Sequence, residues 1–284
     1  MSRAVSPADA VRTELVSIPT DTRPLDGLLY QPDHESARGG VLLFHGNTNN
    51  FYSGPSRFLA PRLVEAGFAC LAFNRRGHDI LTTLEGKRAG GGAFQTAAEG
   101  IADNEAASAF FASRGFAEPV VIGHSNGGML GAHFVAHHPE VRALVLLSAH
   151  AGGPGTYLRS SAAGQMAADR AESYLERARE LVAEERGEEL LLMPGWWFVI
   201  SAASLLDRHE NTPDLLENAR SIRCPSLFLV GDLEAPETYP AKEFARCVAG
   251  PSEARILENC DHWYTGQKDY VADSVAEWLD GVLR

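Results

Sequence analysis

Short apolar runs alternate with longer amphipathic segments along most of the chain. The apolar runs that predict strands lie at residues 15–18, 27–30, 41–44, 69–73, 120–122, 143–147, 227–230 and 255–257. Helical periodicity is found at residues 56–66, 93–113, 127–137, 241–249 and 270–282. Several central runs are apolar on both faces, as parallel strands covered by helices require. The pattern predicts an α/β fold: a doubly wound, mostly parallel eight-stranded sheet with helices on both faces and an antiparallel pair at its N-terminal edge.

The alternation is interrupted once, in the second half of the chain. Residues 167–185 have the periodicity of an amphipathic helix, a second helical run covers residues 201–207, and no strand is predicted around them. We therefore expect residues 1–150 and 220–284 to form the core, and residues 151–219 to form a helical cap inserted after the sixth strand. The alternative is a peripheral helical subdomain that contacts no functional site.

Charge and composition narrow the range of partners. The chain of 284 residues carries a formal net charge of -12, which repels nucleic acid and anionic membrane surfaces at long range. We expect a small-molecule substrate and a monomer or homodimer.

Residues 1–15 hold no apolar run of signal-peptide length, and nowhere do 18 apolar residues stand together, so a cytoplasmic protein is expected. Four scattered cysteines predict free thiols: Cys70, Cys224, Cys247 and Cys260.

One serine stands where a predicted buried strand ends. Val120-Val-Ile runs directly into Gly-His-Ser-Asn-Gly, with Ser125 between two glycines and a helical segment following. Such glycines let the backbone turn sharply from strand to helix, so that the hydroxyl is exposed above the sheet. Here the chain resembles the serine hydrolases of the α/β-hydrolase fold, and the resemblance extends from about Leu15 to the C-terminus.

A serine hydroxyl needs a base within hydrogen-bond reach. The loop Asn259-Cys-Asp-His-Trp-Tyr follows the last predicted strand and resembles the family loop that carries this base, which implies His262. A capping histidine is the alternative. The family pattern G-x-x-D after the seventh strand implies Glu234 as the acid, with Asp232 as the alternative. The other family position for the acid, after the sixth strand, reads Ser148-Ala-His and contains no acid.

Two N–H groups are needed to stabilise the oxyanion. The resemblance implies the amide of Asn126, which follows the nucleophile, and that of Asn47 in the His45-Gly46-Asn47 turn. The alternative for this turn is a tight bend with a satisfied histidine. Arg75 and Arg76 lie in a turn that resembles the family segment bracing the oxyanion loop, and we interpret both as structural.

Several aromatic residues are candidates for the wall of an apolar substrate pocket, although each is as plausible a core residue. These residues, with one histidine, are Phe51, Tyr52, His150, Trp196, Trp197 and Trp263.

His133 and His137 have the i, i+4 spacing of zinc ligands, but Phe134 stands where a metalloprotease needs its glutamate, so we expect them to interact with carbonyls at the helix end. No metal or cofactor is predicted.

The sequence therefore predicts a serine hydrolase that cleaves a carboxylic ester, or a related acyl bond, of a small apolar or aromatic substrate through an acyl-enzyme. Carbon–carbon bond hydrolysis, lactone opening, amide cleavage and acyl transfer remain alternatives on the same triad. Two others belong to different classes: a small-ligand-binding protein without catalysis, and an interaction module whose helical segment recruits a partner.

Overall fold

A large sheet organises the molecule. The computed structural model describes residues 11–33, 37–84, 88–195 and 199–283. In sheet order the strands are β1 (Val11–Ile18), β2 (Leu25–Pro32), β4 (Phe68–Phe73), β3 (Gly39–Phe44), β7 (Val120–His124), β8 (Ala143–Leu147), β11 (Ser226–Gly231) and β12 (Ser252–Leu257). Strand β2 is antiparallel to β1 and β4, and the pairs from β4 to β12 are parallel. This confirms the predicted eight-stranded, mostly parallel sheet.

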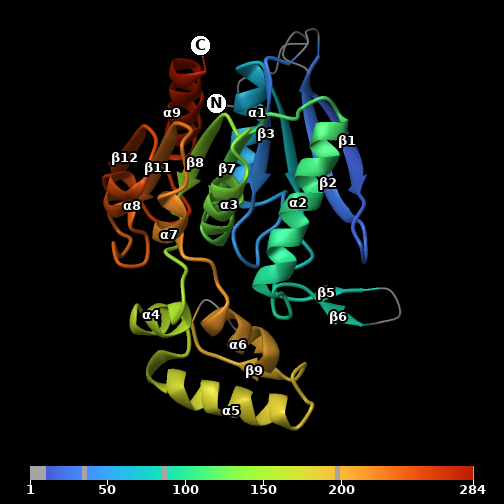
Figure 1. Cartoon of the computed structure of the whole chain (residues 1–284), viewed down its shortest axis with the longest axis vertical. Helices are drawn as coiled ribbons and strands as arrows, with labels where there is room; N and C mark the ends of the chain where they lie inside the picture. The colour runs from blue at the N-terminus through green and yellow to red at the C-terminus, as the bar shows by residue number, and fades with distance from the viewer. Residues whose placement is uncertain (1–10, 34–36, 85–87, 196–198, 284) are drawn as a thin grey trace.

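Helices cover both faces of the sheet (Figure 1). On strand β3, Leu42 and Phe44 belong to one apolar cluster, whereas Val41 and Leu43 belong to another. The first cluster includes side chains of α2 (Ala97–Ser113), α3 (Asn126–His137), α7 (Leu215–Ala219) and α8 (Ala241–Cys247), and the second those of α1 (Gly54–Glu65) and α9 (Lys268–Val282). Burial on both faces explains why the central strands are apolar throughout.

Helix α2 begins later than the predicted residue 93. Thr96 is its N-cap and accepts a hydrogen bond from the Glu99 N–H at 3.3 Å, while the Glu99 side chain accepts one from the Thr96 N–H at 2.9 Å. This capping box satisfies two of the donors left free at a helix start and sets the first residue at Ala97. Ala93, which was expected to start the helix, is buried without being helical.

The segment between β8 and β11 lies beyond one end of the sheet in Figure 1 and has an apolar cluster of its own, which includes Tyr157, Leu175 and Leu205. Its elements before α7 are α4 (Thr156–Ala162), the 3-10 helix η3 (Ala168–Arg170), α5 (Ala171–Ala183), β9 (Leu190–Leu192), β10 (Val199–Ser201) and α6 (Ala202–Glu210). The prediction of no strand here was wrong, because β9 and β10 form an antiparallel pair. They are too short for a periodic signal.

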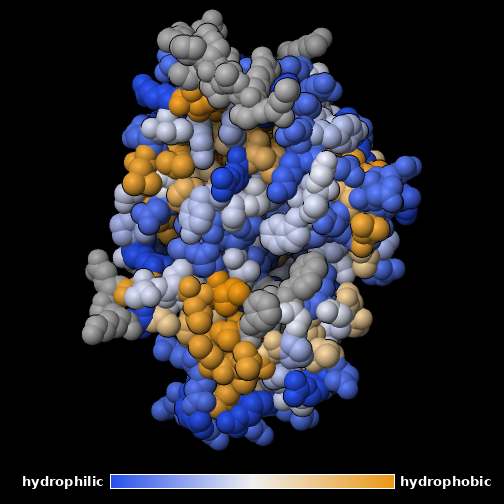
Figure 2. All heavy atoms as spheres, turned by 180° about the vertical axis from the view of Figure 1, so that it is seen from behind, coloured by the Kyte–Doolittle hydropathy of each residue, from blue (hydrophilic) through white to orange (hydrophobic). Residues whose placement is uncertain are grey.

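The predicted helix over residues 167–185 is also shorter in the structure. Ala167 and Ala168 have positive φ angles of 59° and 46°, which an α-helix does not allow, so α5 begins only at Ala171. Figure 2 shows an apolar surface patch on this part of the molecule. The exposed apolar residues of the segment between β8 and β11 include Val182, Leu190 and Leu192. Among the described helices, none has the length and apolar character needed to cross a membrane.

A short ribbon of β5 (Thr82–Thr83) and β6 (Ala89–Gly90) precedes α2.

Candidate active site

Ser125 lies at the sharp turn between β7 and α3. Its φ and ψ angles are 55° and -122°, a strained conformation for a residue with a side chain. The flanking glycines are required by close packing: a Cβ on Gly123 would lie 2.3 Å from the Gly127 carbonyl oxygen, and one on Gly127 would lie 2.3 Å from the carbonyl oxygens of Phe44 and His45. The turn thus holds a partly exposed serine at the start of a helix, where the backbone dipoles favour negative charge.

His262 follows β12 and is paired with a carboxylate from the loop after β11. Its Nδ1 lies 2.6 Å from Oε1 of Glu234, and the exposed fractions of the two side chains are 7% and 4%. A short contact between two buried groups fixes the ring orientation and makes Nδ1 the protonated nitrogen, since a carboxylate can only accept. The opposite ring nitrogen, Nε2, is then the one able to accept a proton.

The second carboxylate oxygen of Glu234 is hydrogen-bonded to groups of the core. Its Oε2 accepts hydrogen bonds from the Gly231 N–H at 3.0 Å and from the Ser148 hydroxyl at 2.6 Å. The Tyr264 hydroxyl lies 2.8 Å from Ser148 Oγ and 3.2 Å from the Leu229 carbonyl oxygen. Because the Ser148 hydroxyl donates to the Glu234 carboxylate, the Tyr264 hydroxyl is the donor toward Ser148 Oγ and the Leu229 carbonyl oxygen. The acid is therefore anchored at both oxygens.

Sequence reasoning did not assign Ser148 or Tyr264 a role. Ser148 occupies the position after β8 that was searched for an acid, and it contributes a donor to the acid that comes from β11 instead. Tyr264 is part of the same loop motif as His262 and is fully buried. Their positions next to strand ends are the only sequence signal that they carry.

Asp232, the alternative acid, has a different position. It is exposed, and its Oδ1 accepts a hydrogen bond from the Cys260 N–H at 3.2 Å. Asp232 therefore braces the start of the histidine loop, whereas the carboxylate in contact with His262 is that of Glu234.

His124 joins the histidine loop to the Ser125 turn, and the sequence analysis did not single it out. Its Nε2 donates to the His262 carbonyl oxygen at 3.0 Å, and the two imidazole rings are 4.6 Å apart. Burial, with the nearby His262 ring, places the pKa of His124 well below its usual value, so this ring is neutral at ordinary pH. This buried contact joins the backbone of His262 to the residue that precedes Ser125.

The loop after β3 lies directly against Ser125. A Cβ on Gly46 would be 3.3 Å from Ser125 Cβ and 3.0 Å from His124 Nδ1, so this position must remain a glycine. Asn47, the predicted oxyanion donor, is the next residue and is partly exposed. Of the two predicted oxyanion residues, Asn126 follows Ser125 in the chain, and Asn47 follows the glycine that packs against Ser125.

Arg75 braces this loop from below, as predicted. It is fully buried; its backbone N–H donates to His45 Nε2 at 3.0 Å and its guanidinium to the His45 carbonyl at 2.6 Å. His45 Nδ1 in turn donates to the Gly46 carbonyl at 2.7 Å. Burial lowers the pKa of Arg75 to about 10 and holds the pKa of His45 well below its usual value. Arg76 pairs with buried Asp103 at 2.7 Å and is likewise structural.

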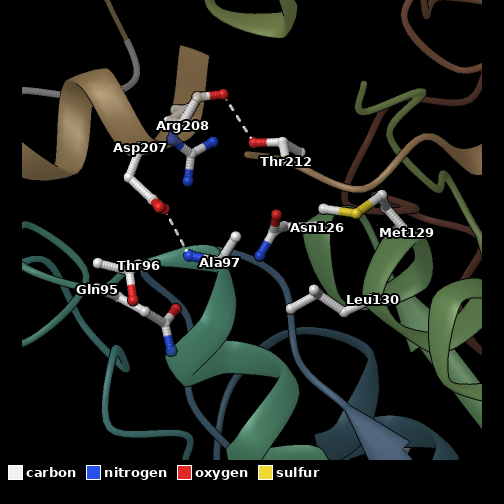
Figure 3. Close-up of a pocket in the computed structure, with 9 residues that line it drawn as sticks. All are labelled: Gln95, Thr96, Ala97, Asn126, Met129, Leu130, Asp207, Arg208 and Thr212. Carbon is white, nitrogen blue, oxygen red and sulfur yellow. Dashed lines mark hydrogen bonds between the residues drawn. The ribbon is translucent and has the colours of Figure 1, made fainter. Parts of the chain in front are cut away.

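Besides a pocket of about 480 Å³ beside Asp232 and Glu234, two pockets contact His262 and Asn126. One, of about 320 Å³, is lined by His262, Glu234 and Trp263 together with Tyr239 and Gln165. The other is small and lies at the start of α3, where the side chain of Asn126 is directed into it (Figure 3).

The predicted pocket residues are dispersed. Phe51 is 9% exposed and packs in the core edge-on to Tyr52, which is half-exposed with its hydroxyl 3.4 Å from Asp79. The His150 ring is hydrogen-bonded within the protein, where its Nδ1 accepts from the Gly152 N–H at 3.0 Å. Burial lowers the pKa of His150 to about 3. Trp263 lines the pocket of about 320 Å³ that contains His262. The remaining candidates, Trp196 and Trp197, lie outside the described residues.

The expectation for the paired histidines of α3 holds for one of the two rings: His137 Nδ1 donates to the His133 carbonyl at 2.8 Å, whereas the His133 ring is hydrogen-bonded with the side chain of Asn218. In the described ranges, no group of three or more His, Cys, Asp or Glu side chains is placed to hold a metal ion.

Comparison with known proteins gives a family for this arrangement. A family model described as the alpha/beta hydrolase fold matches residues 40–187. A search of curated proteins gives no match.

Solved structures resemble the chain over nearly its whole length. Dienelactone hydrolase from Anabaena variabilis is 17% identical, with a TM-score of 0.62 over 96% of this chain and 99% of that one. Est1E from Butyrivibrio proteoclasticus, solved with ferulic acid, is 18% identical, with a TM-score of 0.68 over 94% and 99%. The esterase domain of a Rhodothermus marinus protein is 20% identical, with a TM-score of 0.64 over 94% and 98%. At these identities the likeness is one of fold.

Proposed function

The chain belongs to the α/β-hydrolase family, and we propose that it is a serine hydrolase that cleaves a carboxylic ester, or a related acyl bond, of a small apolar or aromatic substrate. The observation that carries this proposal is the buried 2.6 Å contact between His262 and Glu234, held beside the Ser125 turn by the bond from His124 to the His262 carbonyl. An imidazole oriented by a carboxylate, next to a serine at a strained turn, suits nucleophilic acyl transfer.

In the first step Ser125 Oγ attacks the carbonyl carbon of the substrate and His262 Nε2 takes the hydroxyl proton. The imidazolium that forms is stabilised by Glu234, whose charge lies at Nδ1. His262 then gives the proton to the leaving oxygen as the bond to the alcohol breaks. The alcohol departs and the acyl group remains on Ser125.

The oxyanion of the tetrahedral intermediate needs donors fixed in advance. The N–H of Asn126 belongs to the first turn of α3 and has no acceptor within the helix. The N–H of Asn47 is supplied by the loop that Gly46 allows to approach Ser125 and that Arg75 braces. In the second step a water gives a proton to His262 as it attacks the acyl carbon; the bond from that carbon to Ser125 Oγ then breaks, His262 returns the proton to Oγ, and the acid is released.

We further propose that residues 151–219 form a cap over this site. Three contacts support it: Gln165 Nε2 donates to Tyr239 Oη at 3.0 Å beside His262, the Ser201 N–H donates to the Ala93 carbonyl at 2.8 Å, and Asp207 accepts from the Ala97 N–H at 2.6 Å. A lid at this place restricts water and selects substrates by size.

The test is a panel of p-nitrophenyl esters of increasing acyl length, with lactones, amides and dicarbonyl compounds, assayed with product identification. The proposal expects ester hydrolysis that Ser125→Ala abolishes. Cleavage confined to another class of bond would replace the ester by that bond while keeping the triad. Binding of these compounds without turnover would contradict the enzymatic proposal and favour a ligand-binding protein.

A further inference from the structure

The pocket of about 320 Å³ that contains His262 lies between the core and the segment beyond the sheet. One wall consists of residues 163–165, which follow α4, and the other of residues from the loops after β11 and β12, among them Leu233, Tyr239, His262 and Trp263. Its volume is within the range of small-molecule sites and is large enough for an aromatic ring. We call it the Trp263 pocket.

The position of this pocket indicates which part of an ester it suits. His262 gives its proton to the leaving oxygen in the first step, so the alcohol part of the ester has to lie next to His262. The acyl part is the one that becomes bonded to Ser125. Among the described residues that line the pocket, His262 is present, whereas Ser125, Asn47 and Asn126 are not. This is the arrangement expected of a site for the alcohol part.

Two large apolar side chains at this pocket are exposed. Trp263 is 46% exposed and Leu233 is 69% exposed. The Trp263 ring lies at 84° to the His262 ring, with 5.5 Å between the ring centres. A tryptophan is usually well buried, and at the edge of a pocket it offers a flat apolar surface on which another ring can pack. An apolar alcohol bound here would remove this surface from water.

The polar groups of the pocket are already hydrogen-bonded within the protein. Gln165 Nε2 donates to Tyr239 Oη at 3.0 Å, and both side chains are buried. Asp261 Oδ1 accepts from two backbone N–H groups of its own loop, at 3.1 and 2.9 Å. The described lining includes two acids, Asp261 and Glu234, and neither a lysine nor an arginine. Such a lining disfavours an anionic group, so the ligand that fits it is uncharged.

We propose that the Trp263 pocket receives the alcohol part of the ester, and that Trp263 and Leu233 select bulky, uncharged, apolar or aromatic alcohols over small ones. This inference rests on the proposed hydrolase function and adds to it the side of the scissile bond on which the apolar group lies. The bond between the acyl carbon and the alcohol oxygen breaks, His262 protonates that oxygen, and the free alcohol leaves through the Trp263 pocket.

The experiment uses two isomeric esters that carry the same ring on opposite sides of the ester group. In benzyl acetate the ring is on the alcohol, and in methyl phenylacetate it is on the acid; methyl acetate has no ring. Values of kcat/KM are measured by pH-stat at pH 7.5 and expressed relative to methyl acetate, as an alcohol preference for benzyl acetate and an acyl preference for methyl phenylacetate. Benzyl and methyl acetate form the same acetyl-enzyme and release alcohols of nearly equal acidity, so their difference reports how the alcohol is bound.

The wild type is expected to have an alcohol preference above one. Trp263→Ala should lower this preference by about 10-fold, the loss typical of an aromatic contact, and should leave the acyl preference unchanged. Leu233→Ala should lower it by about threefold. Leu192→Ala is the matched control: this leucine is 73% exposed, lies on β9 and is not among the residues that line the pocket, so neither preference should change.

Three results would overturn the inference: an alcohol preference of one or less in the wild type, an alcohol preference that Trp263→Ala leaves unchanged, and an equal or larger fall of the acyl preference in that variant. If circular dichroism shows that Trp263→Ala is unfolded, Leu233→Ala takes its place in these comparisons. An equal fall of the alcohol preference in Leu192→Ala would also overturn it. Failure of the proposed function is separate: the wild type would hydrolyse none of the three esters and would not be labelled by a fluorophosphonate.

Discussion

Replacing Glu234 by glutamine should inactivate His262 by changing which ring nitrogen carries the proton, while the two side chains stay in contact. Oε2 of Glu234 faces the Gly231 N–H, a donor that cannot reverse its role. The glutamine amide must therefore turn its oxygen toward Gly231 and its NH₂ group toward His262 Nδ1. The imidazole is then driven to carry its proton on Nε2, where the lone pair that accepts the Ser125 proton is needed.

This change of the imidazole tautomer sets the expected loss of kcat. The equivalent aspartate-to-asparagine change in another serine hydrolase lowers kcat by about ten-thousandfold, or about 5.5 kcal/mol of transition-state stabilisation. We expect a loss of this order in Glu234→Gln, measured as kcat on p-nitrophenyl acetate at pH 7.5, with an unchanged melting curve. The side chains are nearly equal in size, so the fold is preserved.

Asp232→Asn is the matched control, because it changes the other carboxylate of the same loop. Its oxygen can still accept from the Cys260 N–H, and an exposed substitution of this kind changes free energies by about 0.5 kcal/mol, or about twofold in rate. If Asp232→Asn removed activity and Glu234→Gln kept it, the assignment of the acid would be refuted.

Three further outcomes are expected. Ser148→Ala removes the 2.6 Å bond to Glu234 and should lower kcat by about tenfold; an unchanged kcat would exclude a positioning role. Gly127→Ala would put a Cβ 2.3 Å from two carbonyl oxygens and should lower the Tm by several degrees, whereas Gly131→Ala, with its nearest neighbour at 3.4 Å, should not; equal Tm values would contradict the packing. Burial lowers the pKa of His150 from 6.5 to about 3. Between these two pH values the unfolded chain binds a proton on His150 that the folded chain does not bind. The free energy of unfolding should therefore fall as the pH falls, by about 1.4 kcal/mol per pH unit for this proton. Urea unfolding between pH 4 and 7 should show a shallower dependence in His150→Asn, and an unaltered slope would count against burial of the neutral ring.

Much of the fold could be predicted because it depends on patterns local to each segment. Strands such as β4 and β8 are buried along their whole length and read as continuous apolar runs. The pair of β9 and β10 was missed because three residues per strand give no period, and the pairing joins two segments that are not adjacent in the chain. The start of α2 was placed too early because Ala93 is apolar and buried without being helical.

The site was less accessible to sequence reasoning where several segments meet. Ser125, His262 and Glu234 follow strand ends and were found by motif, and the structure brings the last two into contact. The Ser148 and Tyr264 bonds join residues 86 and 116 positions apart to form one network, which no local pattern encodes. Phe51 was a candidate for the pocket by chemistry alone, and a large aromatic side chain fills a core equally well.

The central claim is that the Ser125 hydroxyl is a nucleophile activated by His262. It is tested most directly by incubating the protein with a fluorophosphonate at pH 7.5 and mapping the adduct by peptide mass spectrometry. The account predicts a single adduct on Ser125, formed in the wild type, absent from Ser125→Ala and strongly slowed in His262→Gln. A folded wild type that forms no adduct, or one labelled equally after Ser125→Ala, would contradict it.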